Sequence, residues 1–368
     1  MPPVPQVKLP HKSIHSRLKA GRNVPKDDPA RRVESIVVRK HWTSVCILVA
    51  TTIFLARPAM PDALDAAAQA NISETITTSM LLTNGEAVRF GLWNFNPNDY
   101  FEIDNDQFGS ADSAQLRQEI SVVSLPYQWQ THLPGSDDEL LVLAKLAYLD
   151  IDQDIQVVAS DNPGQDELRD TVISGELGGA WRHHIDRHWR VTLGLYSHLL
   201  HYKNRTRYKT EASKPFAPVL DGVLTNISVN ALVAEPTLTV NYLLDAQGAQ
   251  WNFFSDYHYI AGTTYGAHIE AHKAKPEAFF WSNGLRVKVP TKAAFLPAQD
   301  LWLRAARVDV GGDMSHALGS THYYEAGVAW LVETNDFMGI LDNIGIGINF
   351  NYGSVLRGGS IIFMFNEK

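Results

Sequence analysis

The chain has 368 residues, of which 45% are hydrophobic, and a formal net charge of −8, so it is long enough for one large β domain or two smaller ones. No run approaches the ~18 consecutive apolar residues of a membrane-spanning helix, which excludes a helical membrane protein. Residues 1–42 hold ten Lys/Arg and three Asp/Glu, a balance of +7, which leaves −8 − 7 = −15 for the remainder. Because this larger part is acidic, we do not expect nucleic acid as a partner.

The first part of the chain has the features of an extension followed by a secretory leader. Residues 1–40 are basic, contain proline and lack periodicity, which predicts a disordered segment. The apolar run 45–56 (VCILVATTIFLA) follows basic residues and precedes small ones, as in a signal peptide. We place this leader at 41–68, with Ala68 as its last residue and any position from Ala56 to Ala70 open. The alternative is a buried strand or short helix of the fold.

The single cysteine, Cys46, lies inside the predicted leader. The mature chain therefore offers neither disulfide bonds nor thiol chemistry. Residues 69–86 are predicted to form a linker, or a short helix in the lumen of the domain that follows.

From residue 87 to residue 368 the sequence alternates between apolar and polar residues. In the segment 344–352 the positions 344, 346, 348, 350 and 352 are Ile, Phe or Tyr, and the positions between them are Gly or Asn. Successive side chains of a strand point to opposite faces, so one face is apolar and the other is small or polar. This alternation predicts an all-β fold, an antiparallel transmembrane β-barrel that is apolar outside and polar inside. The segments are 87–95, 119–131, 139–150, 170–182, 188–201, 237–245, 250–260, 279–289, 299–310, 321–333, 342–352 and 359–365.

The connections between these segments support the count. Long and short gaps alternate along the chain, as in bacterial barrels with short periplasmic turns and long external loops. Twelve strands place both ends of the barrel on the periplasmic side. Treating 223–233 as a separate strand breaks the alternation, so we interpret it as an extension of a strand or part of a loop; ten or fourteen strands stay open.

Aromatic residues fit the same picture. Seven tryptophans fall near the ends of the predicted strands, where aromatic girdles meet lipid headgroups: Trp93, Trp129, Trp181, Trp189, Trp251, Trp281 and Trp330.

The last strand looks like the signal that the outer-membrane barrel-assembly machinery reads. It has Gly358 followed by alternating Ile361, Phe363 and Phe365, although three further residues follow the last Phe. Together with the size and strand number, this strand resembles the solitary outer-membrane autotransporter β-domain family of Gram-negative bacteria over residues 71–368. The resemblance implies an outer-membrane barrel similar to an autotransporter translocator but without a large passenger. Its expected partners are outer-membrane lipid, lipopolysaccharide and the assembly machinery.

Charged and histidine side chains on the polar side of the strands are the candidate functional residues. They would either pair across the lumen and close it, or stay apart and set the ion selectivity of a pore. The predicted pore-lining residues are Arg89, Glu176, Arg182, Arg190, His198, Asp256, His258, Arg286, Lys288 and Glu325.

Catalytic and metal sites have weaker support in the sequence. The turn 183–188 holds three histidines and an aspartate, which are competent metal ligands, but a solvated turn is the simpler interpretation; we predict no metal and no cofactor. The pairs Asp256 with His258 and Ser197 with His198 supply catalytic residue types, yet no G-x-S-x-G motif occurs. We therefore predict a non-enzymatic pore or membrane structural protein. An outer-membrane hydrolase, a lipase or protease, is the first alternative and a secreted soluble β protein the second.

Overall fold

The structure is a computed structural model that describes residues 60–85, 93–101, 105–107, 110–158, 165–291, 298–337 and 341–365. The predicted extension 1–40, the apolar core of the leader and Arg89 lie outside these residues. No helix among the described residues has the length and hydropathy to cross a membrane. The helices are α2 (Met60–Leu82), α3 (Asn98–Phe101), α4 (Ala111–Glu119), α5 (Ala217–Leu220) and α6 (Asp313–Leu318), with short 3-10 turns η1 (Lys214–Phe216) and η2 (Glu270–His272).

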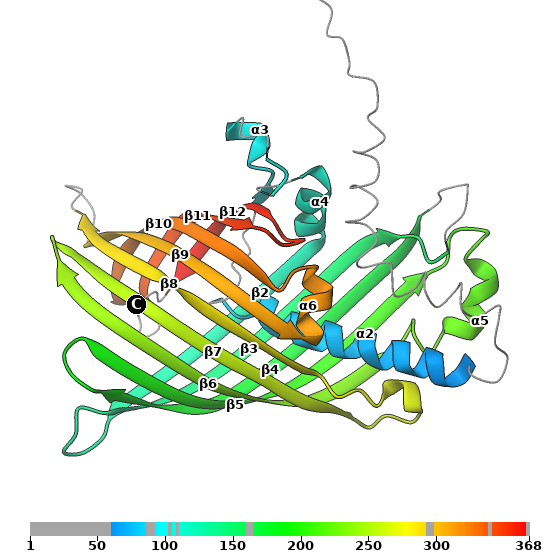
Figure 1. Cartoon of the computed structure of the whole chain (residues 1–368), viewed down its shortest axis with the longest axis horizontal. Coiled ribbons are helices and arrows are strands. Elements are labelled where there is room, and N and C mark those ends of the chain that lie inside the picture. Colours follow the sequence, from blue (N-terminus) through cyan, green and yellow to red (C-terminus); the bar gives the residue numbers. More distant parts are fainter. Residues whose placement is uncertain are drawn as a thin grey trace, which may run out of the picture.

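The described strands form one antiparallel sheet that curls around α2 (Figure 1). Their order is β1-β12-β11-β10-β9-β8-β7-β6-β5-β4-β3-β2, so each strand from β2 to β12 pairs with its neighbours in sequence. The twelve predicted strands are confirmed, and residues 228–233 extend β6 as expected. The strands are β1 (Trp93–Phe95), β2 (Ile120–His132), β3 (Glu139–Ile155), β4 (Asp166–His184), β5 (Trp189–Arg207), β6 (Ser228–Ala246), β7 (Ala249–Tyr265), β8 (Glu277–Thr291), β9 (Gln299–Gly312), β10 (His322–Phe337), β11 (Leu341–Tyr352) and β12 (Gly358–Phe365).

The connections divide the barrel into two different ends. At one end the hairpin joining β6 and β7 has only Gln247 and Gly248 between its strands, both with positive φ (55° and 75°), as a type I′ turn requires. The connections at the other end include residues 208–227, which carry η1 and α5. By the rule for outer-membrane barrels, we assign the short turns to the periplasmic end and the long loops to the external end.

The outer face of the barrel carries an apolar band of limited height. On β5 the exposed, outward residues run from Trp189 through Leu193 and Leu195 to Leu199. These ten residue steps span about 25 Å across the membrane for a strand rise of ~3.3 Å and a tilt of ~40°. That height matches the apolar band of outer-membrane barrels. Beyond Leu199 the outward residues become polar, so β5 continues above the membrane surface.

Helix α2 fills the external half of the lumen. Its alanine-rich segment 63–70 and Asp62 in the first turn favour a helix. Ile72, Ile76 and Leu81 are fully buried in one hydrophobic cluster that includes lumen-facing residues of the barrel wall, such as Tyr202 and Phe280. The interior of this half is therefore apolar and not polar as predicted, because the helix supplies apolar surface for the wall to cover.

The direction of α2 follows from its contacts. Near its beginning, Ala68 shares a buried cluster with Leu220 and Leu224 of the long 208–227 connection, and the Gln69 side chain donates to the Glu270 carbonyl in another external loop (2.8 Å). The helix thus begins at the external mouth and ends inside the lumen.

Helix α4 joins the two edges of the sheet. Among the described residues no backbone pairing connects β1 with β2. Ser110 caps α4 through a capping box, and the fully buried Arg117 donates to the Leu356 carbonyl (2.5 Å) and to Ser360 Oγ of β12. The Asn94 side chain of β1 donates in turn to the Arg117 carbonyl (2.8 Å). Side-chain contacts of α4 therefore bridge the gap between β12 and β2.

Candidate functional site

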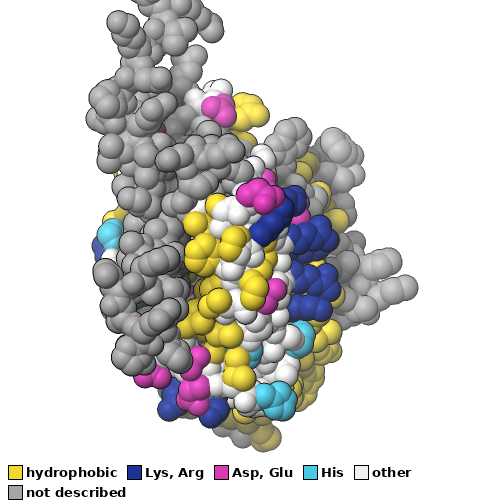
Figure 2. Space-filling model, turned by 90° about the vertical axis from the view of Figure 1, so that its right-hand side faces the viewer, with side chains coloured by type: hydrophobic (Ala, Val, Ile, Leu, Met, Phe, Trp, Pro, Cys, Tyr) yellow, Lys and Arg dark blue, Asp and Glu magenta, His cyan; other side chains and the backbone are white. Residues whose placement is uncertain are grey.

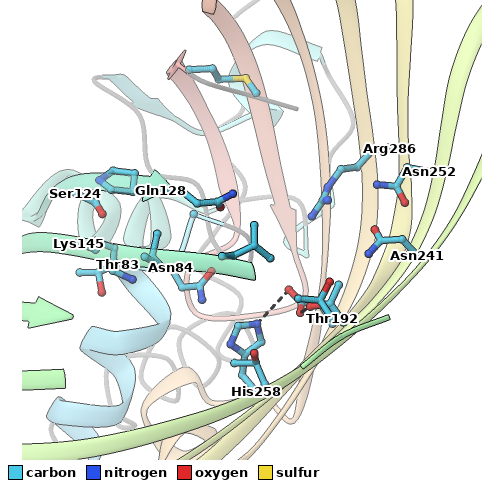
Figure 3. A pocket seen from close by; sticks show the side chains of 18 of the residues that line it. Thr83, Asn84, Ser124, Gln128, Lys145, Thr192, Asn241, Asn252, His258 and Arg286 are labelled. Atoms are coloured by element: carbon cyan, nitrogen blue, oxygen red, sulfur yellow. Dashed lines mark hydrogen bonds and ion pairs between the residues drawn. The ribbon is translucent and has the colours of Figure 1, made fainter. Parts of the chain in front are cut away.

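A cavity of ≈ 2400 Å³ occupies the lumen beneath the end of α2. Thr83 and Asn84 at the end of α2 reach into it from one side, and Asn241, Asn252 and Arg286 line the opposite wall (Figure 3). The cavity includes residues close to the periplasmic turns and consecutive residues of β2. It is therefore the part of the lumen that lies between α2 and the periplasmic turns.

Six ionisable side chains form a connected group at the cavity, which we call the lumen cluster: Lys145, Glu176, His198, Glu235, Asp256 and His258. They come from the five neighbouring strands β3 to β7. Their common orientation follows from the two-residue repeat, since each lies on the inward face of its strand.

The contacts within the lumen cluster form one chain. The Lys145 ammonium contacts the Glu176 carboxylate, and Glu176 Oε2 lies 3.6 Å from His198 Nδ1. Glu235 bridges the two histidines, 2.5 Å from His198 Nε2 and 2.6 Å from His258 Nδ1. Asp256 Oδ2 completes the chain 3.1 Å from His258 Nε2. Each carboxylate is thus held by at least one nitrogen group, as buried charges require.

A second buried network lies on the opposite side of the barrel. Arg304 Nε is 3.4 Å from Glu325 Oε2, and both side chains are 0% exposed. Asn349 Nδ2 donates to Glu325 Oε1 (2.7 Å). The Arg304 guanidinium also lies over the Phe254 ring, 5.0 Å from its centroid. This network packs the lumen on its own side.

The structure places the predicted pore-lining residues in two groups. His198 and Glu325 face the lumen but are buried in the two networks, at 4% and 2% exposure. The others that the structure describes line the cavity: Glu176, Arg182, Arg190, Asp256, His258, Arg286 and Lys288. Some of these are also paired, such as Arg182 with Glu139 (2.8 Å) and Lys288 with Asp300 (3.1 Å). The sequence analysis did not predict Lys145, Glu235 or Arg304 as lumen residues, although each belongs to the inward-facing set of side chains of its strand.

The candidate catalytic residues do not assemble as the hydrolase alternative requires. His198 is buried in the lumen, whereas Ser197 is exposed on the opposite face of β5, because neighbouring strand residues point to opposite sides. Asp256 and His258 do meet, but both belong to the lumen cluster. The nucleophile proposed from the sequence is therefore separated from its base.

The histidine-rich turn 183–188 is held by local hydrogen bonds. His183 Nδ1 lies 2.7 Å from Asp138 Oδ1, and this hydrogen bond lowers the pKa of the Asp138 carboxyl below its ordinary value. Asp186 accepts from the amides of His188 and Trp189, which lower its pKa in the same way. Both carboxylates thus stabilise the turn geometry.

The proposed assembly-signal residues occupy β12. Gly358 begins the strand with φ +144°, a conformation that L side chains rarely adopt, and a Cβ there would lie 3.1 Å from Arg117 Cδ. Phe363 points outward and is 62% exposed. The backbones of Ile361 and Phe365 pair in register with β11. The strand therefore presents alternate side chains to the lipid.

Comparison with known families decides the class of this barrel. The family model of the solitary outer membrane autotransporter beta-barrel domain matches residues 73–367. The chain belongs to this family. The family and its fold place the protein in the bacterial outer membrane, as the sequence predicted.

Two solved structures are similar in fold to this autotransporter-type barrel. One is the β domain of the Bordetella autotransporter Brka, with 11% sequence identity and a TM-score of 0.40 over 67% of this chain and 87% of that one. The other is the transport unit of the autotransporter AIDA-I from Escherichia coli, with 11% identity and a TM-score of 0.39 over 80% of this chain and 96% of that one. Among curated proteins no sequence matches.

Proposed function

We propose that this autotransporter-like barrel is a closed pore of the outer membrane, with α2 as its plug, and that it has no enzymatic activity. The observation that carries this proposal is the burial of α2 in the external half of the lumen. The barrel would be silent while the helix is in place and would conduct ions through the polar cavity when the helix is displaced.

The dimensions of the barrel support a tight plug. Twelve strands ~4.8 Å apart and tilted by ~40° give a circumference of about 75 Å and a backbone diameter of about 24 Å. Inward side chains narrow this by about 10 Å, which leaves ~14 Å for a helix that is ~10–12 Å wide with its side chains. A single helix is therefore wide enough to fill the lumen.

The contacts of α2 support a stable plug. Ile72 and Ile76 are 0% exposed, and burial of each such side chain contributes ~1.5–3 kcal/mol. The large cavity lies in the other half of the lumen, where Lys145 and Arg286 line it. Ions entering from the periplasm would therefore stop at the end of α2.

Planar-bilayer conductance of the purified, refolded protein tests the plug. The chain starting at Met60 should give no steady current, and a deletion of residues 60–85 should give open channels. Ile76→Asp, which puts a carboxylate into the apolar cluster, should give frequent openings, whereas Ala66→Asp at an exposed position of the same helix should stay silent. Steady conductance of the unaltered protein, or closed barrels after the deletion, would show that α2 is not the plug.

We also propose that the external end of β5 contacts lipopolysaccharide. Lys203, Arg205 and Arg207 follow the apolar band on β5, and all three point outward. On the neighbouring strand β4, Arg169 lies opposite Arg205 in the register of the sheet. Figure 2, which views this end of the barrel, shows Lys and Arg side chains gathered along one flank. We call these four residues the basic stripe.

The height and charge of the basic stripe fit the phosphates of lipopolysaccharide. On β4 the exposed apolar residue Ile173 is level with His201, two residues beyond Leu199, so the apolar band ends below Lys203 on both strands. Arg169 and Arg207 are paired with Asp150 and Glu167, whereas Lys203 and Arg205 make no ion pair among the described residues. Two cations just above the acyl chains are free to bind phosphate oxygens.

The binding test compares one pair of substitutions with a single control substitution. Lys203→Gln with Arg205→Gln should reduce the lipopolysaccharide retained by the purified barrel at least about threefold, since a cation near an anionic surface contributes about 1 kcal/mol. Arg187→Gln in a periplasmic turn is the matched control. Equal retention by all variants would contradict this contact.

A further inference from the structure

We propose that Glu176, His198 and Glu235 of the lumen cluster bind a divalent transition-metal ion, for which Zn²⁺ is the best match. This site is independent of the plug, because it lies on the wall of the barrel and not on α2. It would fasten three neighbouring strands, β4, β5 and β6, beneath the apolar half of the lumen.

The geometry brings ligand atoms of two types together. Glu176, His198 and Glu235 are all buried, and each offers one ligand atom within 4.8 Å of the other two. Glu176 Oε2 and His198 Nδ1 lie 3.6 Å apart. Two ligands on one tetrahedral Zn²⁺ ion lie about 3.4 Å apart, given bonds of ~2.1 Å. Glu176 and His198 Nδ1 therefore already have the separation of two ligands of one ion, whereas Glu235, which contacts the other ring nitrogen of His198, has to turn towards them to complete the site.

The lumen cluster holds more carboxylates than ammonium groups. Three carboxylates, on Glu176, Glu235 and Asp256, face a single ammonium, on Lys145. With neutral imidazoles the six side chains carry a net charge of −2. Because a buried charge has to be compensated, either two protons on the histidines or one divalent ion must supply the missing +2.

The surroundings are arranged as in known metal sites. Glu176 Oε2 is buried, and its contacts are the ion-pair contacts with Lys145 and His198. His258 holds the second oxygen of Glu235 (2.6 Å), as outer partners hold the ligands of metal ions. Glu176 and Glu235 also line the cavity, so water from the cavity can complete the coordination.

The ligand types select the metal. Imidazole with carboxylates suits Zn²⁺ and similar transition metals, whereas Mg²⁺ and Ca²⁺ prefer oxygen ligands alone. Lys145 competes with the metal, because its ammonium sits against Glu176. Its removal should therefore strengthen metal binding, an outcome that a purely structural ion-pair network does not predict.

Isothermal titration of the chelator-treated, refolded chain with ZnCl₂ and MgCl₂ tests the site. The unaltered protein should bind one Zn²⁺ and no Mg²⁺, and the same site should give a Co²⁺ absorption band. His198→Gln and Glu235→Gln should weaken Zn²⁺ binding at least about tenfold. Lys145→Met should tighten it, with a larger rise of the melting temperature on Zn²⁺ addition.

The matched control is the double variant His183→Gln, His184→Gln in the periplasmic turn, which removes two histidines without touching the lumen cluster. It should bind Zn²⁺ as the unaltered protein does. Loss of binding in this control but not in His198→Gln would assign the ion to the turn and overturn the proposal, as would the absence of Zn²⁺ binding by the unaltered protein. If the ligand variants do not fold, tighter binding by Lys145→Met supports the site and unchanged binding refutes it.

Discussion

The buried pair of Arg304 and Glu325 offers a sharp test of what holds the barrel interior together. Both side chains are fully buried, and their closest atoms are 3.4 Å apart. Glu325→Gln keeps the shape of the side chain and an oxygen that can accept from Asn349, but it leaves the Arg304 guanidinium without its carboxylate. Removing one partner of a buried ion pair costs ~3–5 kcal/mol, so we expect a loss of this size in the free energy of unfolding. The assay is urea unfolding in lipid vesicles, followed by tryptophan fluorescence.

Two further variants separate this effect from others. Glu270→Gln removes a carboxylate of an exposed pair with Lys273, whose side chains are 62% and 57% exposed, and should cost less than ~1 kcal/mol. The double variant Arg304→Met, Glu325→Leu should recover most of the loss, because apolar replacement of a whole buried pair is often neutral. Equal losses for Glu325→Gln and Glu270→Gln would refute the reasoning, and so would a double variant that is less stable than Glu325→Gln.

Three other predictions concern the leader, the gap between β12 and β2, and the last strand. The mature chain should begin at or before Met60, because cleavage after Ala68 would remove the part of α2 that packs on the external loops. N-terminal sequencing of the outer-membrane form tests this prediction, and a start at residue 69 would contradict it. Arg117→Met should lower the temperature at which the folded barrel unfolds on gels, since hydrogen bonds of a charged group contribute ~1.5–3 kcal/mol; an unchanged temperature would mean that α4 does not bridge the edges. Gly359→Ala should reduce the yield of folded barrel because its Cβ would lie 2.4 Å from the Phe95 ring, whereas Gly175→Ala, with 3.8 Å to its nearest neighbour, should fold normally; similar yields would contradict this.

The strands were predictable because one face of each meets lipid. Their external ends were not: β5 runs to Arg207 and β6 starts at Ser228, beyond the predicted limits 201 and 237. Above the membrane the alternation reverses on β6, where Val229 and Ala231 are buried against the core. The alternation with apolar residues on the outer face is present only where the strand meets lipid, although the strand itself continues beyond the lipid.

The lumen cluster was only partly predictable for a related reason. The alternation of side chains along each strand predicts that Glu176, His198 and His258 point inward, as they do in the structure. This alternation does not give the height of a residue along the barrel axis. The stagger between β5, β6 and β7 places Glu235 between both histidines. The register of neighbouring strands, which no single segment contains, determines that contact.

The direction of α2 has a consequence for how the polypeptide is threaded. Because the helix starts at the outer mouth and β12 ends at the opposite rim, whatever amino acids are fused ahead of Met60 emerge on the cell exterior while the carboxyl end stays below. A peptide grafted there would be displayed to the medium, and the absence of cysteine after position 46 leaves such a carrier free for site-directed thiol labelling.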